Sequence, residues 1–297
     1  MKILVTGGSG FIGKHLCDIF YEHYKIYVLG TKKNVDQIKT DKRKIFPYYY
    51  SDYSYDSLSQ IISSLQPDAV IHLAGYRLQP DKKQPVNYMD NLSISANLFQ
   101  ACADNNVVNI VLASTIGVYS QKNSFPWVEN QLQSPQNPYS LSKYWVEQTA
   151  EYFNRKGLNI TVLRIAQVIG KGEREGYALQ VYIKNAKTGL PITIFGECKG
   201  KRHYVYVNDV VSAINAAILK PEEKGIYNVG MKNIYGFDEL AKTINSVFGD
   251  KSEMLYNKEA KADENIYQMS IDKAKIKLDW EPQWDLKEAM SDMAKEE

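Results

Sequence analysis

The first thirteen residues of the chain limit its possible folds more than any other stretch. A short apolar run at residues 3–5 is typical of a strand that is buried on both faces. Gly7, Gly10 and Gly13 then recur every third residue, and the last two complete the pattern G-x-G-x-x-G with Gly8. Because glycine has no Cβ, the backbone here can turn tightly and admit a pyrophosphate onto the N-terminus of the following helix. The stretch predicts a dinucleotide site, rather than a tight turn alone, with contacts from Gly7, Gly10, Phe11, Ile12 and Gly13.

Composition and charge narrow the class of protein. With 297 residues, 44% of them hydrophobic and 24% charged, the chain can bury the core of one soluble enzyme. A formal net charge of +2 gives no general attraction to nucleic acid or to an anionic membrane, and no apolar run reaches transmembrane length. Cys17, Cys102 and Cys198 lie far apart without the spacing of metal ligands. We therefore expect reduced thiols, no metal site and a cytoplasmic enzyme.

Strand and helix patterns alternate along the first half of the chain. Buried strands are predicted near residues 26–29, 69–73 and 108–113, with amphipathic helices between them. This alternation is typical of an α/β fold, a Rossmann doubly wound parallel sheet whose ligands bind outside the carboxyl ends of the strands. Beyond about residue 165 the alternation loosens, which predicts a smaller C-terminal substrate domain. The expected division is an NAD(P)-binding domain at residues 1–165, which also receives elements from about 203–230, and a mainly substrate-binding domain at residues 166–297.

The end of the second predicted strand bears on the choice of cofactor. NAD-binding domains usually place an Asp or Glu there, on the ribose hydroxyls, whereas this chain has Gly30, Thr31, Lys32 and Lys33. A carboxylate would repel the ribose phosphate of NADP, and an ammonium group attracts it. The sequence therefore favours NADP(H), with Thr31 and Lys32 as contacts, over NAD(H) as the alternative. If the two lysines only form a solvated loop, the missing acid alone supports NADP(H).

Two hydroxyl residues and a Tyr-Lys pair are the candidate catalytic groups. Ser114 and Thr115 end a predicted strand, where side chains face the cofactor cleft. Tyr139 and Lys143 lie four residues apart in a predicted helix that runs to about residue 155, so they share one face of it. A phenol has an ordinary pKa of about 10, and a neighbouring ammonium group lowers that pKa. We expect Tyr139 to act as general acid or base, helped by Lys143, while the Thr115 hydroxyl orients the reacting oxygen.

Together these motifs resemble the extended short-chain dehydrogenases/reductases of the NAD-dependent epimerase/dehydratase family, most of which act on nucleotide sugars. The likeness covers nearly the whole chain, from residues 6–13 to the tail at 272–284. It implies that Thr115, Tyr139 and Lys143 are catalytic, and that Lys143 also holds the nicotinamide ribose. Together with the positions of the strand ends, it predicts cofactor contacts at Asp52, Tyr53, Leu73, Ala74, Gly75 and Asn91, and substrate contacts at Ser114, Gln167 and Arg202.

Two departures from the family pattern bear on the reaction. Sugar-nucleotide dehydratases of the family carry an acidic pair after the catalytic threonine, whereas this chain has Ile116 and Gly117, so dehydration lacks its acid and base. The family's usual asparagine is Gln167 here, at a position that bears on phosphate or sugar contacts.

Arg202 matches the family pattern. It occupies the place of an arginine that binds the substrate diphosphate in the family, a role that suits the forked donors of a guanidinium group.

These features predict an enzyme that acts on a nucleotide-linked sugar. The favoured reaction is NADPH-dependent reduction of a 4-keto sugar, in which Tyr139 protonates the oxygen. A 4-epimerase that oxidises the sugar transiently with NAD needs the same residues and is the first alternative. A non-catalytic dinucleotide sensor is the weakest. The resemblance also implies a homodimer, paired through helices around residues 85–106 and 139–156.

Overall fold

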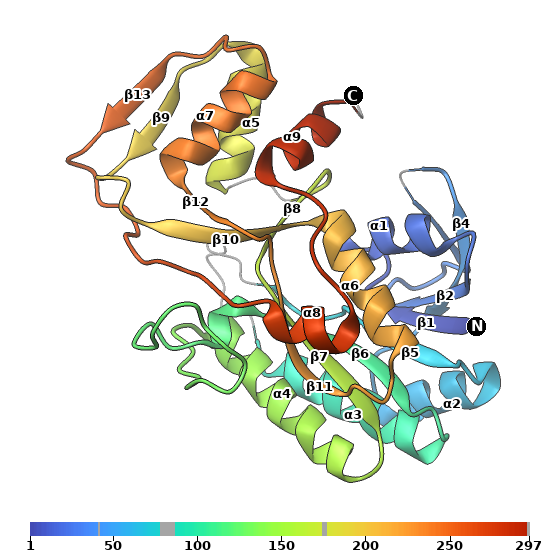
Figure 1. Cartoon of the computed structure of the whole chain (residues 1–297). Helices are drawn as coiled ribbons and strands as arrows, with labels where there is room; N and C mark the ends of the chain where they lie inside the picture. The colour runs from blue at the N-terminus through green and yellow to red at the C-terminus, as the bar shows by residue number, and fades with distance from the viewer. Residues whose placement is uncertain (41, 78–86, 174–176, 296–297) are drawn as a thin grey trace.

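A large, mostly parallel sheet forms the centre of the computed structural model, which describes residues 1–40, 42–77, 87–173 and 177–295. Within these residues the sheet has eight strands in the order β11-β7-β6-β5-β1-β2-β4-β3 (Figure 1). Neighbouring strands run parallel, except that β3 and β4 are antiparallel. The strands are β1 (Lys2–Thr6), β2 (Lys25–Gly30), β3 (Gln37–Lys39), β4 (Ile45–Tyr50), β5 (Ala69–His72), β6 (Asn109–Thr115), β7 (Asn159–Ile165) and β11 (Gly225–Val229).

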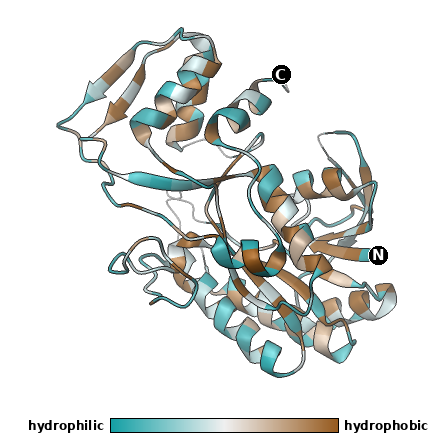
Figure 2. Cartoon of the chain, in the orientation of Figure 1, coloured by the Kyte–Doolittle hydropathy of each residue, from teal (hydrophilic) through white to brown (hydrophobic). Residues whose placement is uncertain are grey.

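Helices cover both faces of this sheet because the strands alternate their apolar side chains between the two faces. In β1, Ile3 and Val5 share a buried cluster with α1 and α6, whereas Leu4 joins α2, α3 and α4 on the opposite face. Figure 2 shows the hydrophobic colour along the central strands. The helices are α1 (Phe11–Phe20), α2 (Tyr55–Leu65), α3 (Asp90–Asp104), α4 (Pro138–Arg155) and α6 (Val207–Leu219). The predicted Rossmann doubly wound sheet is confirmed.

A second, smaller part contains short strands and the remaining long helices of the described chain (Figure 1). Its sheets have the orders β12-β10-β8 and β13-β9. The strands are β8 (Gln167–Ile169), β9 (Ile192–Phe195), β10 (Lys201–Tyr206), β12 (Ile234–Gly236) and β13 (Met254–Asn257), and the helices are α5 (Ala178–Thr188), α7 (Phe237–Val247) and α9 (Leu286–Lys295). These helices bury one common apolar cluster, which includes Leu179, Leu240 and Met290. None of the helices in the described ranges is both long and apolar enough to cross a membrane.

The two parts exchange segments of chain. After β10, which belongs to the smaller part, α6 packs on the large sheet and β11 extends that sheet beside β7. A further helix, α8 (Asp272–Leu278), also returns to the large sheet, where Ala274 and Leu278 join its core. The division at residue 165 stays a prediction. The structure adds that α6, β11 and α8 pack with the elements that precede this division.

The strand order reverses between β1 and β5. From β1 the chain proceeds through β2 and β4 to one side of the sheet, and from β5 through β6 and β7 to the other. Ligands of doubly wound sheets bind outside the carboxyl ends of the strands at such a reversal. Thr6 and His72, the last residues of β1 and β5, are partners in the parallel register. The turns that follow these two residues are therefore the expected location of the site.

Candidate active site

The glycine-rich turn after β1 lies against the turn after β5. Gly7 has a φ of +74°, in the left-handed region, and a Cβ added to it would lie 2.8 Å from the backbone nitrogen of Ala74. A Cβ on Gly13 would collide with the carbonyl oxygen of Gly7. Gly10 precedes α1 and gives its first N–H groups no side-chain cap. A cavity of about 160 Å³ lies at this helix N-terminus, between Phe11 and Lys14 on one side and Lys171 and Gly172 on the other.

Buried hydrogen bonds fix the turn after β5. Thr6 Oγ1 lies 2.7 Å from His72 Nδ1, and His72 Nε2 lies 2.9 Å from Ser95 Oγ. The Ser95 hydroxyl donates to the Asn91 carbonyl oxygen, so it accepts the Nε2 proton of His72, whose Nδ1 then accepts from Thr6. Burial lowers the pKa of His72 to about 3, which keeps the ring neutral. His72 is therefore a structural histidine, and the backbone N–H of Ala74 donates to the same Thr6 hydroxyl.

The N-terminus of α4 is set by its cap. Asn137 Oδ1 accepts the backbone N–H of Ser140 at 2.9 Å, and Pro138 occupies the first turn, where its missing N–H costs nothing. The helix therefore begins at Pro138, so that Tyr139 lies in its first turn and Lys143 one turn later.

The structure brings the three candidate catalytic residues together. The Thr115 hydroxyl, at the end of β6, lies close enough to the Tyr139 hydroxyl to lower the pKa of that phenol. Lys143 Nζ donates to the Ala113 carbonyl oxygen at 3.0 Å, two residues earlier in the same strand. The carboxyl end of β6 thus meets the first two turns of α4.

The pKa of Tyr139 corrects one expectation. Burial raises the pKa of Tyr139 to about 12, because it disfavours the charged phenolate. The cation that lowers this pKa most is Arg77, which follows β5, while Lys143 directs its ammonium group at the Ala113 carbonyl. The expectation that Lys143 makes the phenol acidic is therefore wrong. Tyr139 holds its proton at neutral pH and can donate it.

Lys143 lies among the predicted cofactor contacts of β5 and α3. A Cβ on Gly75 would lie 2.9 Å from Asn91 Oδ1 and 3.7 Å from Lys143 Nζ, so only glycine fits there. The Asn91 amide donates to the Tyr76 carbonyl at 3.0 Å and accepts the Tyr76 N–H at 2.6 Å, which holds the turn closed. Leu73, which follows β5, donates its backbone N–H to the Thr6 carbonyl and so extends the pairing of β5 with β1 by one hydrogen bond. Burial lowers the pKa of Lys143 to about 8, and the nearby Glu147 carboxylate opposes this shift.

The end of β2 carries no acid. Thr31 and Lys32 are exposed, and the Lys32 N–H donates to the Tyr48 hydroxyl at 2.8 Å. A Cβ on Gly30 would lie 2.5 Å from that hydroxyl, so Tyr48 requires the glycine. The two predicted contacts at this position remain predictions.

Asp52 and Tyr53, predicted near adenine, differ in exposure. The Asp52 carboxylate is exposed and accepts hydrogen bonds from Ser54 at 2.7 and 2.9 Å, which lower its pKa. Tyr53 is 5% exposed and packs in the core on the α2 side. Its burial raises the pKa of its hydroxyl, so this side chain stays neutral.

Arg202, predicted to grip a diphosphate, is paired within the protein. Its guanidinium forms an ion pair with Asp263 at 2.6 Å and lies over the rings of Phe237 and Tyr267. Gln167 begins β8, which runs parallel to β10 and so adjoins the strand that carries Arg202. Gln167 and Arg202 stay predicted substrate contacts. A diphosphate that binds Arg202 has to replace Asp263.

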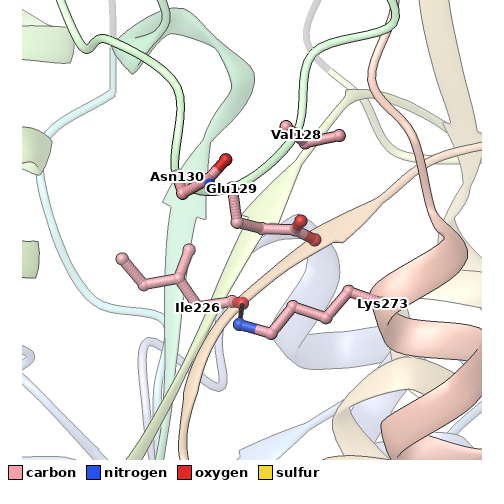
Figure 3. Close-up of a pocket in the computed structure, with 5 residues that line it drawn as sticks. All are labelled: Val128, Glu129, Asn130, Ile226 and Lys273. Carbon is pink, nitrogen blue, oxygen red and sulfur yellow. Dashed lines mark hydrogen bonds between the residues drawn. The ribbon is translucent and has the colours of Figure 1, made fainter.

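A cavity of about 490 Å³ lies elsewhere, at the edge strand β11 (Figure 3). Lys273 Nζ donates to the Ile226 carbonyl oxygen at 2.8 Å, and Glu129 Oε1 accepts the Asn228 N–H at 2.9 Å. These charged side chains cover backbone groups of an edge strand, which discourages pairing with another chain. None of the predicted site residues lines this cavity.

Sequence reasoning missed two charged pairs near the site. Arg77, after β5, forms an ion pair with Glu173 at 3.0 Å. Glu147, one turn after Lys143, forms a buried ion pair with Arg164 of β7. The signal for Glu147 was available, because a carboxylate on the apolar face of an amphipathic helix needs a buried partner.

The described residues fit a dinucleotide at the ends of β1 and β5. Glycines keep Cβ atoms out of the space between the two turns, and the N-terminus of α1 has no side-chain cap. Within the described ranges, no group of His, Cys, Asp and Glu side chains could hold a metal ion. Fold and site together define an enzyme of the dinucleotide-binding short-chain dehydrogenase/reductase class.

Comparisons with known proteins identify the family. Residues 3–230 match the NAD dependent epimerase/dehydratase family, and the chain belongs to this family. It is 30% identical to a UDP-glucuronate 4-epimerase of Thermodesulfobacterium geofontis, over 97% of this chain and 93% of that protein. It is 25% identical to a dTDP-4-dehydro-6-deoxyglucose reductase of Escherichia coli, over 94% and 92% of the two chains. Among solved structures it resembles a UDP-N-acetylglucosamine 4-epimerase from Bacillus cereus, with a TM-score of 0.86, 30% identity, and coverage of 99% and 95%.

Proposed function

We propose that the protein is an NAD(P)-dependent 4-epimerase of a nucleotide-linked sugar. The observation that supports this most is the meeting of Thr115, Tyr139 and Lys143 beside the glycine-lined turns of β1 and β5. Two of the relatives described above, each 30% identical to this chain, are 4-epimerases. Ile116 and Gly117 replace the acidic pair that dehydration requires, which argues against that reaction.

In this proposal the chain moves one proton and orients one oxygen. Bound NAD(P) supplies the hydride acceptor and donor. Tyr139 acts as general base when the C4 hydroxyl is oxidised and as general acid when the C4 carbonyl is reduced, while Thr115 orients the C4 oxygen. Because the buried phenol holds its proton at neutral pH, it has to release that proton to solvent before the oxidation. Lys143 holds the nicotinamide ribose through its ammonium group, which persists at pH values below about 8. Arg202 exchanges Asp263 for the substrate diphosphate, which offers it paired oxygens.

Reduction of a 4-keto sugar with NADPH is the second candidate, and two observations favour it. Lys32 and Lys33 follow β2 in place of the acid that NAD-binding domains usually place on the ribose. Tyr139 retains its proton at neutral pH, as a general acid in a reduction must. The reductase of Escherichia coli is a relative of this kind.

Cofactor exchange separates the two reactions. An epimerase regenerates its cofactor in every cycle, so we expect the purified protein to retain about one NAD(H) per chain and to convert a UDP-sugar without added cofactor. Nucleotide released by denaturation is quantified by chromatography, and sugar products of UDP-glucose, UDP-N-acetylglucosamine and UDP-glucuronate are followed by NMR. A protein that arrives empty and oxidises NADPH with a 4-keto sugar is the reductase. Tight cofactor binding without turnover of any of these sugars indicates the sensor.

The assembly and location of the protein are part of the same proposal. We expect a cytoplasmic homodimer, paired through α3 and α4, which pack side by side on one face of the large sheet. The predicted pairing segment starts at residue 85, and residues 85 and 86 lie outside the described ranges. Light scattering after size-exclusion chromatography measures the mass of the assembly.

A further inference from the structure

A fully buried carboxylate lies one helical turn behind Lys143. Glu147 is 1% exposed and belongs to the inner face of α4. Its Oε2 accepts from Arg164 Nη2 at 2.7 Å and its Oε1 accepts from Arg164 Nε at 3.1 Å, so the pair is bidentate. The Ser114 hydroxyl donates to Oε1 at 2.5 Å. A buried carboxylate requires this degree of pairing to remain charged.

Glu147 and Lys143 hold adjacent residues of one strand. Glu147 accepts the hydroxyl proton of Ser114, and Lys143 Nζ donates to the carbonyl oxygen of Ala113. Ala113 and Ser114 are the two residues before Thr115, which ends β6. The position of Thr115 therefore depends on two side chains of α4 that lie one turn apart.

The charges around Lys143 make its protonation depend on Glu147. Lys143 is 7% exposed, and the described charged group that favours its ammonium form is the Glu147 carboxylate. The other titratable groups around the pair are neutral His72 of β5, protonated Tyr139 of α4 and positive Arg164 of β7. Removal of the carboxylate leaves two cations in a buried space with no anion among these groups.

We propose that Glu147 is a positioning residue, which keeps Lys143 charged and holds the end of β6 through Ser114. The inference rests on the cofactor-binding part of the proposed function, in which Lys143 holds the nicotinamide ribose. Burial lowers the pKa of Lys143, and Glu147 opposes this effect. Loss of the Glu147 charge lowers the pKa of Lys143 further, so that the ammonium form disappears at a lower pH. Glu147 then sets the alkaline limit of cofactor binding and turnover.

The test compares Glu147→Gln with the wild type between pH 6 and pH 10. NADH affinity is measured by fluorescence, and kcat/KM is measured with the UDP-sugar that the wild type converts. We expect the alkaline limb of both profiles to move to lower pH by about one unit. At pH values above the wild-type pKa of Lys143, NADH affinity and kcat/KM are then roughly tenfold lower than in the wild type. Glu147→Asp retains the charge and is expected to restore the limb. Glu151→Gln is the matched control, because Glu151 lies one turn further along α4 in an exposed pair with Arg155, and its profiles stay unchanged.

A second variant covers the case in which Glu147→Gln does not fold because Arg164 is left unpaired in the core. The double variant Glu147→Met/Arg164→Met removes both charges, a replacement that buried ion pairs often tolerate. It is expected to move the limb in the same direction but by less than Glu147→Gln does, because the positive charge of Arg164 is removed together with the carboxylate. A folded variant with an unshifted limb overturns the inference and reduces Glu147 to a structural role. A shifted NADH-binding limb in a protein that converts no sugar supports the inference and overturns the proposed reaction.

Discussion

Tyr139→Phe is expected to lower kcat for the nucleotide-sugar reaction by about 10²- to 10⁴-fold, the usual contribution of a positioned general acid or base. The change removes only the hydroxyl that lies near Thr115, and the ring keeps its edge contact with Tyr88, whose centroid lies 6.1 Å away. NADH affinity and the melting temperature are therefore expected to stay close to those of the wild type. Steady-state kinetics and NADH fluorescence on the same preparation measure the two effects separately.

Tyr152→Phe is the matched control for this prediction. Tyr152 is half exposed and lies near the opposite end of the same helix from Tyr139, so its hydroxyl has no part in the proposed chemistry. Its kinetics should equal those of the wild type. Undiminished kcat in Tyr139→Phe would rule out the proton-transfer role and revive the interpretation of the protein as a dinucleotide sensor.

Gly13→Ala is expected to abolish detectable dinucleotide binding and to destabilise the fold by about 1–3 kcal/mol or more, as overpacking does. The added Cβ would collide with the carbonyl oxygen of Gly7 and would lie 2.6 Å from Gly8 Cα. These atoms belong to the backbone of the glycine-rich turn and cannot rotate away as a side chain can. The turn has to open, which removes the close approach that a pyrophosphate needs. Denaturant unfolding and NADH fluorescence give the two quantities.

Gly157→Ala separates the steric effect from the general cost of replacing glycine. Gly157 lies in the turn between α4 and β7 with a φ of +109°, and an added Cβ would meet no heavy atom within 4 Å. We expect a loss of stability of about 1–2 kcal/mol from backbone strain, with unchanged NADH affinity. If Gly13→Ala bound NADH as tightly as the wild type, the glycine turn would not be the cofactor site.

The start of α4 and the side chains that share one of its faces depend on residues that are close together in the sequence. Asn137 and Pro138 define where the helix begins, and the four-residue spacing places Tyr139 and Lys143 on one face. These relations span a few residues and can be read from the sequence. The direction in which the Lys143 ammonium group points could not be read, because its acceptor is the Ala113 carbonyl, thirty residues earlier in the chain.

Burial and long-range pairing decided the electrostatics of the site. The expected fall in the pKa of Tyr139 became a rise, because desolvation outweighs the effect of nearby Arg77 and depends on every element that packs around the phenol. Glu147 and Arg164 are seventeen residues apart, and Arg77 and Glu173 ninety-six, so no local pattern joins them. The return of α8 to the large sheet is likewise a packing outcome.

By itself the sequence determined the class of fold, the glycine turn and the side chains that share one face of α4, because glycine spacing, alternating apolar residues and helix caps act over short stretches of chain. Only the tertiary structure decided which charges neutralise one another, as Arg202 and Asp263 do, and which hydroxyls already have a partner, as the Ser114 hydroxyl does. The physical reason is that the strength of a charge or a hydrogen bond depends on how much water the surrounding elements exclude. That exclusion exists only after the strands and helices have packed.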